Sequence, residues 1–451
     1  MCTTIAKNAF NGCYALTEWE IDENNTAYVG DHVINGVIWN NTRSEIVGSL
    51  PQTTGSFTVP EGKTIGEGAF MNSGFTEIVL PSTIKTIPKY AFSGSNIETL
   101  VIPEGVEVID QYAFAGSEIK NIIIPASVVT IGHYAFDNCK ALTTLEFAES
   151  SKELTIGNYA FRYCSALESV EIPHRVRRSS TTVAYAVGSY AFGYCSNLQS
   201  VTFEENPTEG AVAGVLNISS DAFRFCKKLT RVDFPAALGN NSSYYALSTR
   251  AFYGCENLET VTFSPDCENS ISIYAQAFDK CYKLKNIELP STLIYLGYGA
   301  FKDTAIESIT IPASVTSMPK GYIYDYLEDG TSGSGSLNIG GQFYGCTQLK
   351  TVVFEAAVAT IETNTFDGCT ALTSITFNTD TITKISDYAF KNCTALTSIT
   401  LPRSVTTFGV GVFSGWTATQ VVNANRTELE SYQWSVLWNK DCLAQIVYLQ
   451  A

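Results

Sequence analysis

Thirteen cysteines are the most reactive side chains in this sequence, and ten of them occupy one recurring position. Each of the ten stands three residues after a phenylalanine that itself recurs along the chain. Cysteine can act as a nucleophile, bind a metal or form a disulfide. The ten are Cys13, Cys139, Cys164, Cys195, Cys226, Cys255, Cys281, Cys346, Cys369 and Cys393.

Other copies of the repeat hold Ser73, Ser95, Ser117 or Thr304 at this position, which indicates a requirement for a small buried group. We therefore expect free thiols. Disulfides between neighbouring repeats are the alternative, but parallel Cβ vectors give them poor geometry. Metal binding is less favoured, because the sequence has no Cys-x-x-Cys pair and no Cys/His cluster.

The three histidines, His32, His133 and His174, are far apart in the sequence, and nothing joins them into a triad or a metal site. Serine-hydrolase, zinc-protease, phosphate-loop and dinucleotide motifs are absent from the sequence. Paired carboxylates could serve a glycosidase, but among 44 acidic residues such pairs arise freely, and solvated surface explains them better. We predict no enzymatic activity, no catalytic residues, no cofactor and no metal, and an unrecognised hydrolase is the weakest hypothesis.

The overall charge narrows the possible partners. The 28 basic and 44 acidic residues give a formal net charge of −16, which disfavours nucleic acid and anionic lipid. Apolar residues make up 45% of the 451 positions, enough for a folded core. No apolar stretch approaches the roughly 18 to 20 residues of a membrane helix, so we expect no membrane insertion. Residues 1–7 show no export signal.

An Ala-Phe pair, or a degenerate form of it, recurs fifteen times, at intervals of 22 residues where the spacing is tightest. Short alternating segments such as Leu145-Glu146-Phe147 follow it and resemble strands. Many of these segments end at proline, which cannot extend a strand pairing. Units of this length bury their apolar side only by stacking, so we predict a solenoid of about fifteen coils. The phenylalanines are Phe10, Phe70, Phe92, Phe114, Phe136, Phe161, Phe192, Phe223, Phe252, Phe278, Phe301, Phe343, Phe366, Phe390 and Phe413.

The repeats resemble the BspA-like, or treponemal-type, leucine-rich repeats. Residues 128–147, VVTIGHYAFDNCKALTTLEF, follow the family pattern I-G-x-x-A-F-x-x-C-x-x-L and the strand after it. The resemblance covers most of the chain and implies a leucine-rich-repeat solenoid of short parallel β-strands. It also implies a bacterial or microbial protein that is secreted or displayed on the cell surface, with adhesive rather than enzymatic function.

Four regions are expected along the chain. Residues 1–21 look like a partial N-terminal repeat, and residues 22–60 like a β-hairpin insertion with an Asn35-Gly36 turn. Residues 61–415 form the predicted solenoid, and residues 416–451 the C-terminal cap, where a capping box at 427–430 predicts a helix. The partial first repeat suggests a fragment of a longer protein, whose signal peptide and anchor lie upstream.

Five insertions fall at one phase of the repeat and should emerge on one side as a loop edge. One of them contains Tyr322, Tyr324 and Tyr326 before a Gly/Ser run, and is the best candidate for a contact loop. Another carries Arg175, Arg177 and Arg178 beside His174, which is either a basic patch or a solvated loop. The insertions span residues 174–187, 204–217, 235–247, 264–271 and 319–341.

Two columns of side chains are candidate binding surfaces. The outward residue of three consecutive strands is Val79, Val101 and Ile123, which should form an exposed apolar stripe unless the hairpin covers it. Stacked tyrosines two residues before the motif phenylalanine would give a rigid platform for protein or sugar. A structural role at the sheet edge is the alternative for this column, which comprises Tyr90, Tyr112, Tyr134, Tyr159 and Tyr190.

These observations predict an extracellular or cell-surface recognition protein that binds a protein or glycan, expected to be host-derived, through its strand face and loop edge. A structural spacer or cell-envelope element that presents other domains is the alternative. A spacer does not need an apolar or an aromatic stripe, so these two columns separate the hypotheses.

Overall fold

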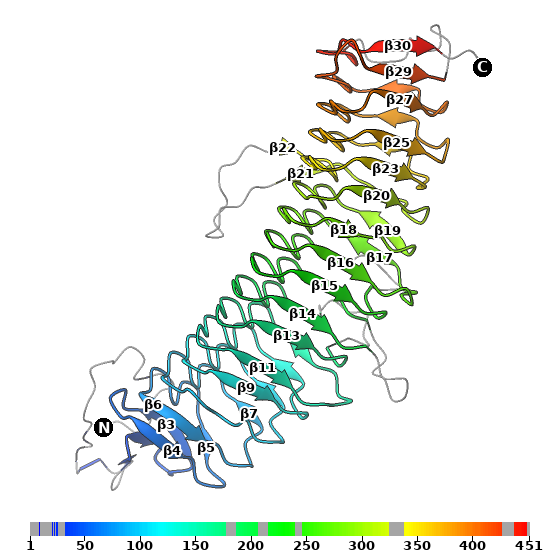
Figure 1. Ribbon diagram of the computed structural model, residues 1–451. Coiled ribbons are helices and arrows are strands. Elements are labelled where there is room, and N and C mark those ends of the chain that lie inside the picture. The colour runs from blue at the N-terminus through cyan, green and yellow to red at the C-terminus, as the bar shows by residue number, and fades with distance from the viewer. Residues whose placement is uncertain are drawn as a thin grey trace. The chain divides into compact units, whose positions relative to one another are not determined.

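The computed structural model describes residues 32–176, 186–205, 215–239, 246–323, 338–425 and 437–448, with Ala9, Glu20, Asp22, Asn24 and Asn25. The chain divides into two compact units. The N-terminal unit comprises residues 1–216 and 225–227, and the C-terminal unit residues 217–224 and 228–451. Within the described ranges every regular element is a β-strand (Figure 1). Those ranges accordingly hold no helix with the length and apolarity of a membrane span.

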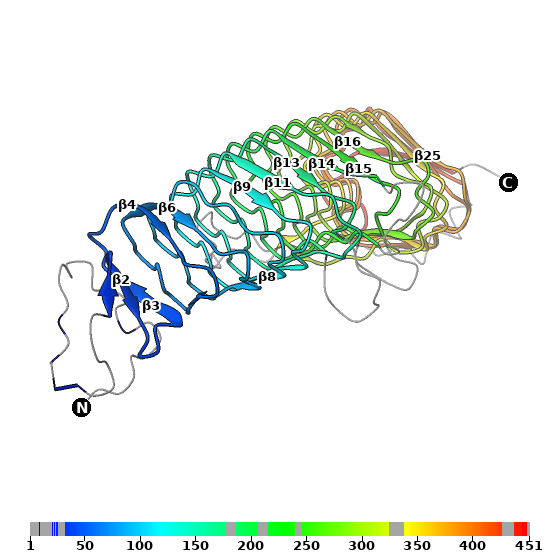
Figure 2. The ribbon, with the colours of Figure 1, turned by 90° about the horizontal axis from the view of Figure 1, so that it is seen from below.

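The coils of the N-terminal unit carry longer strands on one side and two-residue strands on the other, as β9 and β8 show in Figure 2. Strands within each set pair in parallel with their neighbours. The longer strands are β4 (Gly55–Thr58), β6 (Phe75–Val79), β9 (Asn121–Ile124), β11 (Thr144–Phe147), β13 (Ser169–Ile172) and β14 (Ser200–Phe203). The short strands are β5 (Thr64–Ile65), β7 (Thr86–Ile87), β8 (Val108–Ile109), β10 (Thr130–Ile131) and β12 (Thr155–Ile156).

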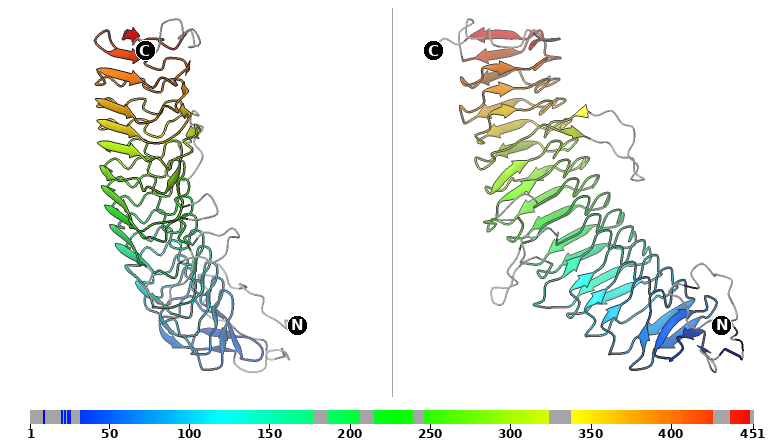
Figure 3. Two further views of the ribbon diagram at one scale, coloured as in Figure 1. Left: turned by 90° about the vertical axis from the view of Figure 1, so that its right-hand side faces the viewer. Right: turned by 180° about the vertical axis from the view of Figure 1, so that it is seen from behind.

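The C-terminal unit repeats this plan, and Figure 3 shows its longer strands as successive parallel arrows from green to red. The longer strands are β15 (Arg231–Phe234), β16 (Thr260–Phe263), β20 (Ser308–Ile311), β23 (Thr351–Phe354), β25 (Ser374–Phe377), β27 (Ser398–Leu401), β29 (Val421–Ala424) and β30 (Gln445–Tyr448). The two-residue strand β18 (Asn286–Ile287) lies on the same side and pairs in parallel with β16. The strands on the other side of the coils are β17 (Ile271–Ile273), β19 (Leu293–Leu296), β24 (Thr360–Ile361), β26 (Lys384–Ile385) and β28 (Thr407–Phe408). Separately, β21 (Tyr322–Ile323) pairs antiparallel with β22 (Asn338–Ile339). Both units confirm the predicted solenoid of short parallel strands.

Equivalent residues of neighbouring coils lie directly beside one another. Leu145 pairs with Ile122, and Val170 pairs with Val201, so apolar side chains face the core in every coil. The residue between two inward side chains faces solvent because successive strand residues point to opposite faces. One outward residue per strand therefore produces a continuous column on the surface.

The motif phenylalanines form the centre of both units. In the N-terminal unit the Phe114 ring lies 5.1 Å from Phe92 and 4.8 Å from Phe136, nearly parallel to both, and none of the three is accessible to solvent. The backbones of neighbouring coils are also hydrogen-bonded at this position, since the Phe114 amide donates to the Ala135 carbonyl at 2.7 Å. Offset stacking adds aromatic attraction to the burial of large apolar surfaces.

The motif cysteines satisfy a backbone carbonyl inside this core. The Cys139 thiol donates to the carbonyl of Phe114 at 3.0 Å, and Cys164 donates to Phe136 at 3.2 Å. The described motif cysteines are buried thiols that form no disulfide, as predicted, while Cys13 lies outside the described residues. In the last motif the Trp416 indole donates to the Phe390 carbonyl instead. Burial raises the pKa of Cys139 to about 12, so these thiols are protonated and unreactive at neutral pH.

A column of glycines allows the coils to approach closely. A Cβ atom on Gly157 would lie 2.7 Å from the carbonyl carbon of Gly132, and one on Gly188 would lie 2.5 Å from that of Gly157. These contacts involve backbone atoms, which cannot rotate away. At Gly157 and Gly188, the glycine two residues before the column tyrosine is therefore required because neighbouring coils approach closely there, and not because of an unusual backbone angle.

Replacing Gly157 with alanine should lower the free energy of unfolding by about 1–3 kcal/mol, because the added methyl group forces two backbones apart. Urea denaturation followed by circular dichroism measures this loss. Glu168→Ala, at an exposed position of the same coils, should change stability by less than about 0.5 kcal/mol. A Gly157→Ala protein as stable as the parent would show that the coils can move apart freely.

A β-hairpin lies near the N-terminal end of the described residues. Strands β1 (Val33–Ile34) and β2 (Val37–Trp39) pair across Asn35 and Gly36, whose φ angles of 51° and 76° fit a two-residue hairpin turn. Strand β3 (Glu45–Ser49) pairs antiparallel with β2 and parallel with β5. Strand β4 pairs in parallel with β6, so the segment before residue 61 continues into the stack.

The predicted C-terminal helix over 427–437 lies almost wholly outside the described residues. The described part, 437–448, contains turns and β30, which pairs in parallel with β29. The Trp438 ring lies 5.6 Å from Phe408 and 6.2 Å from Phe413, so an aromatic side chain packs beside the last motif phenylalanine.

Loop length does not alter the stacking of the coils. Ile109 pairs with Ile131, 22 residues later, and Ile156 pairs with Val187, 31 residues later. The additional residues of the longer coil fall between β13 and Val187, where 177–185 lie outside the described residues. The backbone pairing is therefore preserved across insertions of different length.

Candidate interaction surface

Val79, Val101 and Ile123 lie on the solvent side of the long-strand sheet of the N-terminal unit. Their exposed fractions are 46%, 82% and 59%, which are high for apolar side chains of this size. Bridges from Glu77 to Thr99 and from Thr99 to Asn121 hold the three coils in register. We call these three residues the apolar stripe. The alternative that the hairpin covers the stripe is wrong for the described residues.

The surface beside the apolar stripe is hollowed. A hollow of about 610 Å³ lies between the coils of Val101 and Ile123, and its rim includes Pro103, Pro125 and Glu104. A second hollow of about 320 Å³ lies between Val79 and Val101 and is bordered by Glu77. The stripe is therefore a grooved surface, into which side chains of a partner can insert.

The character of the strand face changes from apolar to acidic within two coils. The outward residues after Ile123 are Glu146 and Glu171, and both are exposed. Glu104 and Glu146 border the larger hollow directly. A partner that fits this surface would place apolar groups over the stripe and cationic groups toward the glutamates.

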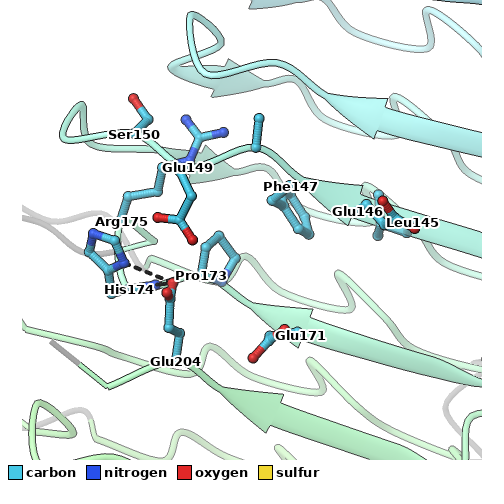
Figure 4. Close-up of a pocket in the computed structure, with 11 residues that line it drawn as sticks. Leu145, Glu146, Phe147, Glu149, Ser150, Glu171, Pro173, His174, Arg175 and Glu204 are labelled. Carbon is cyan, nitrogen blue, oxygen red and sulfur yellow. Dashed lines mark hydrogen bonds and ion pairs between the residues drawn. The ribbon is translucent and has the colours of Figure 1, made fainter. Parts of the chain in front are cut away.

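A polar pocket of about 400 Å³ lies farther along the same face (Figure 4). The His174 Nδ1 atom lies 2.8 Å from Oε2 of Glu204, and the backbone amide of His174 donates to the same oxygen at 2.9 Å. Glu149, from the coil before His174, points into the same space (Figure 4). The nitrogen and carboxylate oxygens of the three side chains all lie within 4.8 Å of one another.

No other group of three histidine, cysteine or acidic side chains converges in this way within the described ranges. The cluster was not predicted from the sequence, because Glu204 stands 30 residues after His174 and only the stacking of coils brings them together. The signal that could have found it is position, since Glu149, His174 and Glu204 each stand one or two residues beyond the end of a strand.

The expectation of a basic patch beside His174 is wrong for Arg175. This side chain is fully buried, and its guanidinium donates to the carbonyls of Val128 at 2.8 Å and Pro125 at 3.2 Å. Burial lowers the pKa of Arg175, while Glu149 and Glu104 counteract that effect. Arg175 thus joins the loop to the coil core, whereas Arg177 and Arg178 lie outside the described residues.

The predicted tyrosine stacking is confirmed. Rings of successive coils lie 4.6–5.0 Å apart and nearly parallel along the column Tyr90, Tyr112, Tyr134, Tyr159 and Tyr190. The side chains are half-buried, so their edges reach solvent while their faces contact one another. The binding role of this column stays a prediction.

The backbone explains part of the tyrosine column. All five tyrosines have positive φ angles, from 54° to 60°, a region that few residues other than glycine adopt. Gly68, Gly299 and Gly411 occupy the same repeat position with φ of 68°, 61° and 57°, and these three glycines are the sequence signal for the left-handed turn. Arg162 lies over Tyr159 at 4.8 Å and pairs with Asp137, which further fixes the column.

The contact loop is described only at its base. Tyr322 belongs to β21, which pairs with β22, and Tyr324 and Tyr326 lie outside the described residues. Its binding role stays a prediction.

The model of the BspA type leucine rich repeat region (6 copies) matches residues 63–185, 155–245, 186–327 and 338–449 of this chain. No curated protein matches the sequence. Among solved structures, a leucine-rich repeat protein from Bacteroides ovatus is 19% identical, with a TM-score of 0.48 and coverage of 96% of this chain and 100% of the other. The pneumococcal vaccine antigen PcpA is 19% identical, with a TM-score of 0.44 and coverage of 93% and 100%. A leucine rich cell surface protein from Faecalibacterium prausnitzii is 21% identical, with a TM-score of 0.35 and coverage of 76% and 93%.

Proposed function

This chain belongs to the BspA-type leucine-rich repeat family, and from that premise we propose that it is a non-catalytic recognition protein of the cell surface or extracellular space. Its partner is a protein or glycan of host origin, bound through the strand face and the loop edge of the solenoid. The observation that carries the proposal is the apolar stripe, because a continuous exposed apolar surface is costly in water unless a partner covers it.

The chemistry of the surface supports binding rather than catalysis. The stripe offers Val101 and Ile123 at the edge of a hollow, with the carboxylates of Glu104 and Glu146 beside them. Apolar contacts in such a hollow supply affinity, and the carboxylates select for cationic groups on the partner. The described motif thiols are buried, and those of Cys139, Cys195 and Cys346 have a pKa raised by burial to about 12, so they do not serve as nucleophiles.

Changing Val79, Val101 and Ile123 together to serine should weaken binding of the partner at least tenfold, because about 1 kcal/mol or more is lost at each central apolar contact. The partner is first identified on an array of host matrix proteins and glycans. Surface plasmon resonance then compares the dissociation constants of the parent and the triple variant.

Val447→Ser is the matched control, since Val447 is an exposed apolar residue of β30 in the other unit, with an exposed fraction of 40%. This control should bind like the parent, and circular dichroism should show the same fold for all three proteins. Unchanged binding by the triple variant would exclude the stripe and direct attention to the tyrosine column and the Tyr322 loop. Failure of the parent to bind any member of the array would favour the spacer hypothesis.

A further inference from the structure

We propose that Glu149, His174 and Glu204 form a site for one divalent transition-metal ion of the Zn²⁺ class. The three side chains come from successive coils of the N-terminal unit, just beyond the ends of β11, β13 and β14. They line one pocket and point toward one another across it (Figure 4). This site goes beyond the proposed recognition function and does not depend on it.

The geometry is close to that of a coordinated ion. Four ligands at about 2.0–2.1 Å from a tetrahedral zinc lie about 3.3 Å from one another. The His174 Nδ1 and Glu204 Oε2 atoms are 2.8 Å apart, and the cluster as a whole spans no more than 4.8 Å. Small rotations of side chains therefore suffice to place all three ligand atoms around one ion.

The hydrogen bond between His174 and Glu204 marks where the ion would enter. A proton shared by Nδ1 and Oε2 holds these atoms together, and a divalent cation that replaces it makes the same bridge with a greater charge. The backbone amide of His174 also donates to Oε2, so the glutamate is held in position before any ion binds. Glu149 then adds a second carboxylate from the neighbouring coil.

The surrounding charge favours a cation. Glu146 and Glu171 line the same pocket as Glu149 and Glu204, so four carboxylates and one guanidinium, that of Arg175, line the pocket. The donors of Arg175 reach the carbonyls of Val128 and Pro125 rather than these carboxylates. The pocket thus has an excess of negative charge that a divalent ion would offset.

The ligand set selects the class of metal. Imidazole nitrogen suits zinc and similar transition metals, whereas calcium and magnesium prefer six or more oxygen ligands. The His174 side chain is only 7% exposed and the Glu204 side chain 33% exposed, while Glu149 is open to solvent. One buried nitrogen and two carboxylates leave the outer coordination position to water.

The test is isothermal titration of the metal-stripped, tag-free chain with ZnCl₂. We expect one saturable site and a higher thermal midpoint in the presence of zinc, with CaCl₂ binding at least tenfold more weakly. Co²⁺ in place of zinc should give a visible absorption band that reports nitrogen and oxygen ligation. Tighter binding of calcium than of zinc would overturn the assignment of the metal class.

Glu149→Gln is the decisive variant, because this side chain is exposed and its replacement preserves the shape of the pocket. It should weaken zinc binding at least tenfold, and His174→Ala should abolish the site and the cobalt band. Glu146→Gln, which removes a carboxylate from the same pocket outside the cluster, should weaken zinc binding far less than Glu149→Gln, because it removes a charge but no ligand. Absence of saturable binding, or equal losses in Glu149→Gln and Glu146→Gln, would overturn the proposal.

Discussion

The free energy of unfolding should fall steadily as the pH rises from about 9 toward 12, because the core holds thiols that ionise only after unfolding. Burial raises the pKa of Cys139, Cys195 and Cys346 to about 12. An unfolded thiol loses its proton near pH 8.5, so above that pH the unfolded chain binds fewer protons than the folded chain. The stability contributed by each protonated thiol is complete below the unfolded pKa and is lost as the pH rises toward the folded pKa.

The loss of stability with pH is large because many coils of the repeat each contribute one buried thiol. Each such thiol lowers the free energy of unfolding by about 1.4 kcal/mol per pH unit within this window. Urea denaturation midpoints at pH 8.0, 9.5 and 10.5 under reducing conditions would measure the trend. The cysteines with a raised pKa in the described core are Cys139, Cys164, Cys195, Cys281, Cys346, Cys369 and Cys393.

A matched variant separates thiols from other groups that titrate at high pH. Changing Cys139, Cys164 and Cys195 to serine removes three ionisable groups, and Ser95 and Ser117 show that the position accepts serine. We expect the variant to lose stability less steeply with pH than the parent. Identical slopes would mean that the buried thiols do not govern the alkaline limit.

Phe136→Ala should lower the free energy of unfolding by about 3–5 kcal/mol, the loss typical of a large aromatic side chain removed from a core. The ring is fully buried between Phe114 at 4.8 Å and Phe161 at 5.0 Å, so its removal leaves a cavity with stacked rings on both sides. Backbone pairing between coils restricts how far the cavity can close.

Chemical denaturation measures the total loss, and amide hydrogen exchange shows where it occurs. Exchange should quicken first around Phe114 and Phe161, because each coil contacts mainly its neighbours. Ile123→Ala, at a side chain that is 59% exposed, should cost less than about 0.5 kcal/mol. A loss below 1 kcal/mol for Phe136→Ala would contradict the role assigned to the stacked rings.

The architecture could be predicted because the interior repeats and the repeat is visible in the sequence. Phe136, Cys139 and Leu145 are all buried, and the recurrence of their spacing along the chain predicts how each coil stacks on the next. The left-handed backbone at Tyr134 was not predicted, since tyrosine gives no sign of a positive φ angle. Comparison with the glycines at the same repeat position, Gly68, Gly299 and Gly411, would have revealed it.

The candidate surfaces could be predicted in part. Exposure of Val79 and Ile123 followed from the alternation of strand residues, which depends on local sequence only. The burial of Arg175 and the hydrogen bond between His174 and Glu204 depend on how loops of different length fold against neighbouring coils. Such contacts have no period, so a repeat pattern carries no information about them.

The pairing of Ile156 with Val187 across 31 residues has a consequence for how this surface can diversify. The coils tolerate extra segments at that phase without a change in the register of the strands on either side. Recognition specificity can therefore evolve, or be engineered, by exchanging a loop as a cassette while the stacked core is left unaltered. Coils that carry such loops are the natural places to graft a new binding peptide.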